Sequence, residues 1–300
     1  DGVHFDLTFH PLKYLGRKLI TSAYSDALAD RGEEALLSLS LAIPNSISVN
    51  MIEEFMEGVQ ATAEEYGLGI VSTECTAARH QLCIACGGTW QRTGSALFDG
   101  FGAPSSSDPS QELIIGVTGD LGAAFAGLRI LLREKRVWAQ QAGFDGTESP
   151  TAFEPDLDDY RHVVERQLAP TARIDLRDTL RQLSLEPLFM APVRNGIHQD
   201  LQLVFERMGL GGEIHVSALP VDPETRAVAD ELMEDVDRYA LMGGEDYEMT
   251  LALPRSDFDT LAAAFSDLVP IGRVIPGTSG LTLITESLSD SSDGGGAPAS

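Results

Sequence analysis

The chemically most informative stretch of this sequence is Val117-Thr118-Gly119-Asp120-Leu121-Gly122, which lies between an apolar run and a helical pattern. Glycines allow a tight turn after a strand, and the first turn of a helix offers unpaired N–H groups and a positive dipole end to an anion. This pattern predicts a phosphate site at Gly119, Asp120 and Gly122. The alternative is a glycine-rich helix start in which Asp120 is only an acidic residue of the first turn.

Carboxylates form a second group of candidate functional residues. They stand at the ends of expected strands or helices: Asp26, Glu74, Asp120, Glu245 and Asp246. Mg²⁺ prefers carboxylate and phosphate oxygens, so an ATP-dependent enzyme needs such acids to converge. In a chain this acidic, a single Asp or Glu is more often part of the solvated surface. His4 has no sequence neighbour that would activate it, and an isolated histidine is usually structural.

The elements that must position these residues follow from the spacing of apolar side chains. Alternating apolar and polar residues predict strands, and helical spacing predicts amphipathic helices. Ser48 is the expected N-cap and Gly67 the expected C-cap of a helix over 48–66. The other expected helices span 11–30, 123–134, 157–168, 171–183, 223–234 and 257–265, and the expected strands span 36–43, 68–71, 82–89, 112–117, 214–216, 249–253, 271–274 and 281–284. Their alternation in both halves predicts α/β domains.

The length predicts two domains, because 300 residues exceed one comfortable hydrophobic core. The stretch 100–112 is rich in Gly, Ser, Pro and Asp, which favours a boundary there. We therefore expect one domain over 1–110, a second over 111–286 and a disordered tail over 287–300.

The charge of the chain is strongly negative. Forty-six acids face 21 bases, which gives a net charge of −25, and such a surface repels nucleic acid and anionic lipid. An acidic, lysine-poor surface also suits high salt, so a halophilic source and an acidic mesophilic protein both remain open. No apolar run reaches the length of a membrane helix, and the first residues do not form a signal peptide. We expect a soluble, cytoplasmic protein without a nucleic-acid or membrane partner.

Two of the three cysteines, Cys83 and Cys86, form a Cys-x-x-Cys pattern. Their surroundings predict a buried apolar strand, in which residues three positions apart point to opposite faces. Two thiols on opposite faces of a strand are poorly placed to bind one metal ion. We expect reduced core cysteines, as is common in cytoplasmic proteins.

Several stretches in series, with matching order and spacing over roughly 1–285, resemble thiamine-monophosphate kinase. They are Gly2-Val3-His4-Phe5, Leu15-Gly16-Arg17-Lys18, Ser25-Asp26 with Ala29, Ser38-Leu39-Ser40-Leu41-Ala42-Ile43-Pro44, Val117-Thr118-Gly119-Asp120-Leu121-Gly122-Ala123-Ala124, Arg166-Gln167-Leu168 with Pro170, Ala172 and Arg173, and Gly243-Gly244-Glu245-Asp246-Tyr247-Glu248. Several motifs in order are far more specific than any one of them.

The resemblance implies a fold of two domains, α/β (α+β) in class. An N-terminal mixed-sheet domain would pair with its copy in a homodimer and form a shared β-barrel, and a C-terminal domain would have three α/β layers. The family binds ATP and several Mg²⁺ ions between the domains and transfers the γ-phosphoryl group to thiamine monophosphate, which gives thiamine diphosphate. Metals and positioned donors do most of that work, because phosphoryl transfer depends on electrostatics and position.

Carried over residue by residue, the resemblance implies roles for five positions. Asp26 matches the Mg²⁺-bridging aspartate of the family, and His4 and Glu245 match the positions that contact the thiamine substrate. Thr73 and Glu74 lie where the family has the Gly-Gly-Asp-Thr that holds nucleotide and metal. The small glycines are replaced here, although Glu74 keeps a carboxylate on a longer arm.

The largest departure is Pro192-Val193-Arg194-Asn195-Gly196, where the family has Asp-x-Ser-Asp-Gly. Two carboxylates and a serine are lost, and Arg194, at the position of the serine, places a cation in a segment that is anionic in the family. Arg194 could instead bind a phosphate oxygen directly. The alternatives to an active kinase are a catalytically impaired homologue that keeps the dimer fold, another phosphotransferase of the aminoimidazole-ribonucleotide-synthetase superfamily, and a structural partner.

Overall fold

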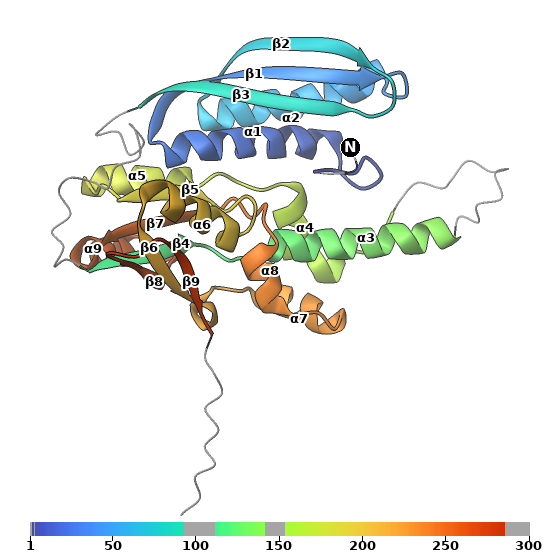
Figure 1. Cartoon of the computed structure of the whole chain (residues 1–300). Helices are drawn as coiled ribbons and strands as arrows, with labels where there is room; N and C mark the ends of the chain where they lie inside the picture. The colour runs from blue at the N-terminus through green and yellow to red at the C-terminus, as the bar shows by residue number, and fades with distance from the viewer. Residues whose placement is uncertain (1, 3, 93–111, 142–153, 286–300) are drawn as a thin grey trace, which may run out of the picture.

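The computed structural model describes residues 2, 4–92, 112–141 and 154–285. These residues form two sheets, each with its own helices, and the helix α1 (Leu12–Ala29) lies between them (Figure 1). The fold is a mixed α/β arrangement, so the predicted fold class is confirmed. The stretches expected to hold the domain boundary and the tail fall almost entirely outside the described residues.

The N-terminal sheet, called sheet A below, has the strand order β2-β1-β3. Strand β1 pairs in parallel with β2 and antiparallel with β3, which makes sheet A mixed. Along β1 the side chains of Leu37, Leu39 and Leu41 are buried in a core shared with α1 and α2, whereas Ser38 and Ser40 face outward and are exposed. The elements are β1 (Gly32–Pro44), α2 (Val49–Tyr66), β2 (Gly69–Ala78) and β3 (Cys83–Arg92).

Helices α1 and α2 pack closely because both have a glycine at their contact. A Cβ on Gly16 would lie 2.5 Å from the carbonyl oxygen of Phe55, and a Cβ on Gly58 would lie 1.9 Å from that of Lys13. The predicted caps of α2 are confirmed: the Ser48 side chain accepts from the Met51 N–H, and Gly67 adopts a left-handed φ of 69°.

The C-terminal sheet, sheet B, has the strand order β5-β7-β4-β8-β6-β9. All neighbouring strands are antiparallel except β6 and β9, which are parallel. Its strands are β4 (Leu113–Thr118), β5 (Phe189–Pro192), β6 (Gly211–His215), β7 (Met249–Pro254), β8 (Leu268–Ile275) and β9 (Gly280–Ile284). The helices of this half are α3 (Ala123–Gln141), α4 (Arg161–Leu168), α5 (Ile174–Leu183), α6 (Ile197–Met208), α7 (Pro223–Glu231), α8 (Val236–Met242) and α9 (Arg255–Ala264).

Two expectations need correction. The polar stretch 72–76 was expected to follow a strand, but β2 continues through it to Ala78. The strand around Cys83 and Cys86 was expected to be buried, whereas Cys83 is exposed and Cys86 half-buried. Cys83 pairs with Ala42 and Cys86 with Leu39, so the two thiols do lie on opposite faces of sheet A. The predicted burial was wrong because no described segment covers the outer face of this sheet.

Candidate functional site

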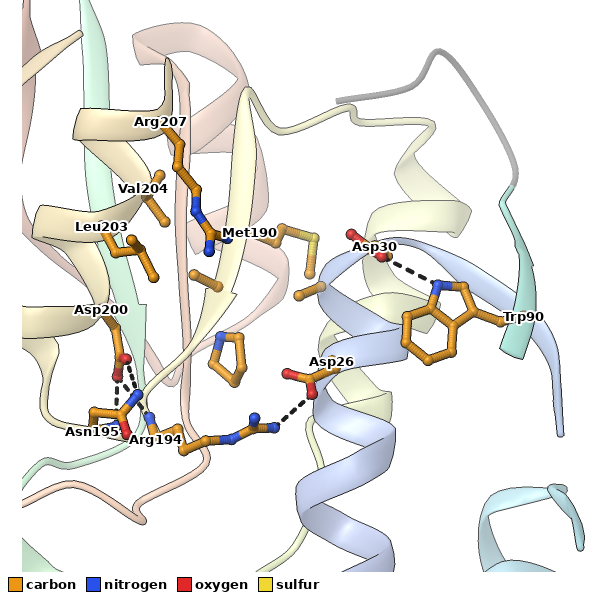
Figure 2. Close-up of a pocket in the computed structure, with 13 residues that line it drawn as sticks. Asp26, Asp30, Trp90, Met190, Arg194, Asn195, Asp200, Leu203, Val204 and Arg207 are labelled. Atoms are coloured by element: carbon orange, nitrogen blue, oxygen red, sulfur yellow. Dashed lines mark hydrogen bonds and ion pairs between the residues drawn. The ribbon is translucent and has the colours of Figure 1, made fainter. Parts of the chain in front are cut away.

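A pocket of about 590 Å³ lies between α1 and the β5–α6 segment (Figure 2). Its walls therefore come from both halves of the chain. The lining residues are Asp26, Ala29, Asp30, Trp90, Met190, Ala191, Pro192, Arg194, Asn195, Asp200, Leu203, Val204 and Arg207. Two residues expected at a nucleotide site from the sequence, Asp26 and Arg194, meet here.

Arg194 is held by the turn that joins β5 to α6. The carboxylate of Asp200 accepts the backbone N–H groups of Arg194 at 2.7 Å and Asn195 at 2.9 Å, and also the Asn195 side-chain amide at 2.8 Å. Gly196 then begins α6 with a φ of 102°, a conformation that favours glycine. Asp200 thus acts as the anchor of the turn, and its oxygens are used within it.

The guanidinium of Arg194 reaches across the pocket to α1. Its Nη2 lies 2.8 Å from the Asp26 carboxylate and donates to the Ser22 carbonyl oxygen at 2.8 Å (Figure 2). Asp26 is 43% exposed and Arg194 34% exposed, so water screens the pair and its contribution to stability is small. The contact joins the two halves of the chain at the mouth of the pocket.

The resemblance implies Mg²⁺ at Asp26 and Glu74, but the described side chains do not fit that ion. A guanidinium bound to the Asp26 carboxylate repels a divalent cation from the same oxygens. Glu74 lies in β2 and lines a different hollow, of about 310 Å³, on sheet A. Within the described parts of the chain, no group of three or more His, Cys, Asp or Glu is arranged to hold a metal ion.

The rest of the pocket combines apolar and basic groups. Trp90 donates its indole N–H to Asp30 at 3.2 Å, which fixes the ring beside the end of α1. Met190 and Val204 continue the apolar wall, and the Arg207 side chain extends from α6 toward Met190 (Figure 2). A flat apolar group and an anionic group could both be accommodated in such a space.

A second cluster joins the first helix to the segment after α8. The Lys18 ammonium, almost completely buried, donates to Glu245 at 2.7 Å and to the Gln167 carbonyl oxygen at 3.0 Å. Burial lowers the pKa of Lys18, and the Glu245 carboxylate opposes that shift. The His4 ring lies 3.6 Å from the other oxygen of Glu245 and is 83% exposed. The two residues expected to contact substrate, His4 and Glu245, are therefore brought together.

This cluster adjoins the pocket through the backbone. The Glu245 N–H donates to the Arg194 carbonyl oxygen at 2.8 Å, and the Tyr247 N–H donates to the Val193 carbonyl oxygen at 3.0 Å. Gly244 makes the close approach possible, since a Cβ there would lie 2.5 Å from the Arg194 oxygen. A ligand in the pocket and a ligand at His4 and Glu245 would consequently be neighbours.

The start of α3, expected to bind phosphate, is occupied by a side chain of the protein itself. The buried Asp246 carboxylate accepts the N–H groups of Gly122 at 2.9 Å and Ala124 at 3.1 Å. Asp120 instead lies 3.3 Å from the His162 ring. The N–H group of Gly122 is thus unavailable to a phosphate in this conformation, and the geometry lends no support to phosphate binding at Gly119, Asp120 and Gly122.

Buried charges behind this turn are paired with one another. Glu248 accepts from Thr118 at 2.5 Å and lies 2.8 Å from Arg166 and 3.0 Å from Arg173. Burial raises the pKa of Glu248, and the two guanidiniums act against that shift. Gly119 leaves room for Glu248, because a Cβ there would lie 2.4 Å from its carboxylate. This network supports the strand ends and does not face the pocket.

Thr73 and Glu74 are expected site residues that the structure places apart from Asp26, Arg194, His4 and Glu245. Both lie in β2 and are exposed, and Glu74 pairs with Ser40 on the outer face of sheet A. Sequence reasoning missed Lys18, Asp200 and Arg207. Lys18 offered one signal, since it is one of only three lysines in the chain.

The comparisons with known proteins agree with the expected resemblance. Residues 1–90 match the family model "AIR synthase related protein, N-terminal domain". Thiamine-monophosphate kinase of Aquifex aeolicus is 27% identical over 278 residues, which cover 92% of this chain and 79% of that protein. The enzyme of the same name from Salmonella typhimurium is 25% identical over 296 residues, which cover 96% and 80%.

Solved structures extend the likeness to three dimensions. The structure of AaThiL complexed with AMPPCP and TMP has a TM-score of 0.72 and 25% identity, covering 94% of this chain and 80% of that one. Thiamine-monophosphate kinase from Stenotrophomonas maltophilia has a TM-score of 0.70 and 26% identity, covering 94% and 82%. The resemblance of this chain to thiamine-monophosphate kinases is thereby confirmed. Among the described helices, none is long and apolar enough to cross a membrane.

Proposed function

We propose that this chain is an ATP-dependent phosphotransferase that converts thiamine monophosphate to thiamine diphosphate. The observation that carries the proposal is the adjacency of the two sites: Glu245 is hydrogen-bonded to the backbone of Arg194, whose side chain lines the pocket. A donor in the pocket and an acceptor at Glu245 would then be close enough to react. The similarity to AaThiL, solved with AMPPCP and TMP, supports both ligands.

On the donor side, ATP would occupy the pocket between α1 and the β5–α6 segment. The volume of about 590 Å³ lies within the usual range of ligand sites. Arg194 would bind phosphate oxygens, and Trp90 with Met190 would contact the base. Asp26 would act on the nucleotide through its contact with Arg194.

On the acceptor side, thiamine monophosphate would lie against His4 and Glu245. Its thiazolium ring carries a positive charge, which the half-buried Glu245 carboxylate would attract. Lys18 fixes that carboxylate from the buried side, so its orientation is set before substrate arrives. Glu245 is therefore the residue on which substrate position depends most.

The chemistry needs little from protein acids or bases. A phosphate oxygen of thiamine monophosphate forms a bond to the γ-phosphorus of ATP, and the bond from that phosphorus to the bridging oxygen of ADP breaks. The attacking oxygen is already deprotonated at neutral pH, so no side chain has to accept a proton. The residues of this chain hold the two phosphates in line and neutralise their repulsion.

The proposed assembly is a homodimer through the outer face of sheet A. Several of its exposed residues are small, among them Ser38, Ser40, Ala85 and Gly87, so a second sheet could approach closely along that part of the face. Edge strands β2 and β3 also have one side without a partner among the described strands. In such a dimer Thr73 and Glu74 would lie at or near the interface.

The test is turnover of the purified chain with ATP and thiamine monophosphate, followed by chromatography of thiamine diphosphate. His4→Ala should raise KM for thiamine monophosphate by roughly tenfold while kcat changes little, because a lost contact to bound substrate affects both the ground and transition states. Since His4 is exposed, the melting temperature should not change.

His198→Ala is the matched control. It lies on α6, outside the pocket and outside the His4–Glu245 cluster, and should leave KM and kcat unchanged. If wild type forms no thiamine diphosphate and leaves both ATP and thiamine monophosphate unchanged, the proposed function is rejected. An unchanged KM in His4→Ala would reject the acceptor site alone.

A further inference from the structure

Two guanidinium groups line the pocket of Figure 2, and its wall has Pro192 and Asn195 in place of the two carboxylates that the resemblance implies. We propose that Arg194 and Arg207 bind the phosphate groups of the nucleotide directly, in place of protein-bound metal ions. The proposal rests on the proposed function in taking ATP as the ligand. It predicts a nucleotide affinity that does not depend on Mg²⁺.

Arg194 is preorganised for this role. Its backbone is fixed by Asp200, and its side chain is directed across the pocket by Ser22 and Asp26. The same nitrogen, Nη2, contacts both the Ser22 oxygen and the Asp26 oxygen, and Nη1 has no partner among the described residues. A planar guanidinium can donate to a phosphate oxygen from Nη1 while Nη2 stays in place.

Arg207 is the second cation and its charge is not compensated. Its side chain makes no hydrogen bond or ion pair with any described residue, and it points from α6 into the pocket beside Met190 (Figure 2). A phosphate group is an anion that both Arg194 and Arg207 could share.

The carboxylates of the pocket are already engaged by protein donors. Asp200 accepts three N–H groups of the turn, Asp30 accepts the Trp90 indole N–H, and Asp26 contacts Arg194. A metal ion would have to displace these donors. A phosphate at Nη1 of Arg194 would leave them in place and would be opposed only by the negative charge of Asp26. Asp26 therefore weakens nucleotide binding if Arg194 binds phosphate, and strengthens it if Asp26 holds a metal ion.

The fluorescence of Trp90 can report nucleotide binding in the pocket directly. The chain has two tryptophans, and Trp138→Phe removes the one on α3, which does not line the pocket. Trp90 fluorescence in this background would be titrated with ATP and with inorganic tripolyphosphate, in EDTA and in excess Mg²⁺. We expect the ATP affinity in the two buffers to agree within about threefold, because guanidinium–phosphate contacts need no metal. A loss of roughly a hundredfold in EDTA would overturn the proposal.

Substitutions then identify the groups. Arg207→Gln should weaken binding of both ATP and tripolyphosphate by about tenfold in either buffer, the usual effect of one lost charge-assisted hydrogen bond. Arg226→Gln on α7 is the matched control, an exposed helical arginine without a side-chain partner among the described residues. Because Arg207 is exposed, its variant should fold normally. Equal affinities in the Arg207 variant and the control would contradict the proposal.

Asp26→Asn distinguishes most clearly between phosphate binding by Arg194 and metal binding by Asp26. If Arg194 binds phosphate, loss of the competing carboxylate should raise ATP affinity several-fold in both buffers. If Asp26 is a metal ligand, the same variant should lower affinity only when Mg²⁺ is present, and the proposal fails. Binding and turnover can also fail separately: EDTA-resistant binding without thiamine diphosphate formation would reject the proposed function and keep this inference.

Discussion

Asp246 occupies the anion-binding N–H groups of the glycine turn at the start of α3. Its carboxylate accepts the two N–H groups that an anion would use, and it is completely buried. Burial raises its pKa to about 7, while Arg166 and the N–H groups act in the opposite direction. Because the helix start is satisfied internally, this turn attaches the segment between α8 and β7 to the start of α3, and the proposed ligand sites do not include it.

His162 should make stability depend on pH. The hydrogen bond with Asp120 raises the pKa of His162, and Asp222 adds to the rise while Arg166 opposes it. A raised folded pKa gives stability that is complete below the unfolded value of 6.5 and is lost as pH rises through the folded value. Water screens this half-exposed pair, so the loss should be on the order of 0.5 kcal/mol.

The measurement is urea unfolding of wild type and His162→Gln between mildly acidic and mildly alkaline pH. The variant should show a flatter profile, and the difference should vanish at the alkaline end. A wild-type profile that the substitution leaves unaltered would show that His162 is not charged in the folded protein. His215→Gln, an exposed histidine at the end of β6 without an acidic partner among the described contacts, serves as the control.

The resemblance named Asp26, Arg194, His4 and Glu245 as site residues, but it did not predict which of them would be in contact. In the structure Asp26 meets Arg194, and His4 meets Glu245. The role of Asp246 was not predictable from its neighbours, since its contacts with α3 span more than a hundred residues of chain. Local patterns show that a helix start can bind an anion, but not which anion the fold brings there.

At the scale of elements, α1 and α2 approach each other closely where they cross at Gly16 and Gly58. Gly58→Ala should destabilise the protein by about 2 kcal/mol, because the added methyl meets the Lys13 carbonyl oxygen and the clash exceeds the gain in helix propensity. Chemical unfolding monitored by circular dichroism would measure it. Gln60→Ala, exposed on the same helix, should have little effect. A Gly58 variant as stable as wild type would mean that the helices can separate without cost.

Elements with a strong period were predictable, and elements defined by tertiary contacts were not. α2 was predicted with both caps because its apolar spacing and terminal residues agree. β5 was missed, since it has four residues, ends in Pro192 and is defined by its pairing with β7. α6 was missed although Ile197, Leu201 and Val204 have helical spacing, because Gly196 offers no side-chain cap.

At the scale of the molecule, the open outer face of sheet A predicts association. Ala85→Arg should convert a dimer into a 32.2 kDa species in light scattering, since a long charged side chain would hold two sheets apart. Ala227→Arg, on the exposed side of α7, should leave the mass of wild type unchanged. A wild type that remains a monomer across a series of salt and protein concentrations would contradict the proposed assembly.

The most direct test of the account is phosphorus NMR of the purified chain mixed with ATP, Mg²⁺ and thiamine monophosphate. We predict that the γ-phosphate signal of ATP and the signal of thiamine monophosphate decrease together, while ADP and thiamine diphosphate appear in equal amounts. This result requires both sites to be occupied in the same molecule and the phosphoryl group to pass between them. Formation of ADP with inorganic phosphate alone, or no change in a protein shown to bind both ligands, would contradict it.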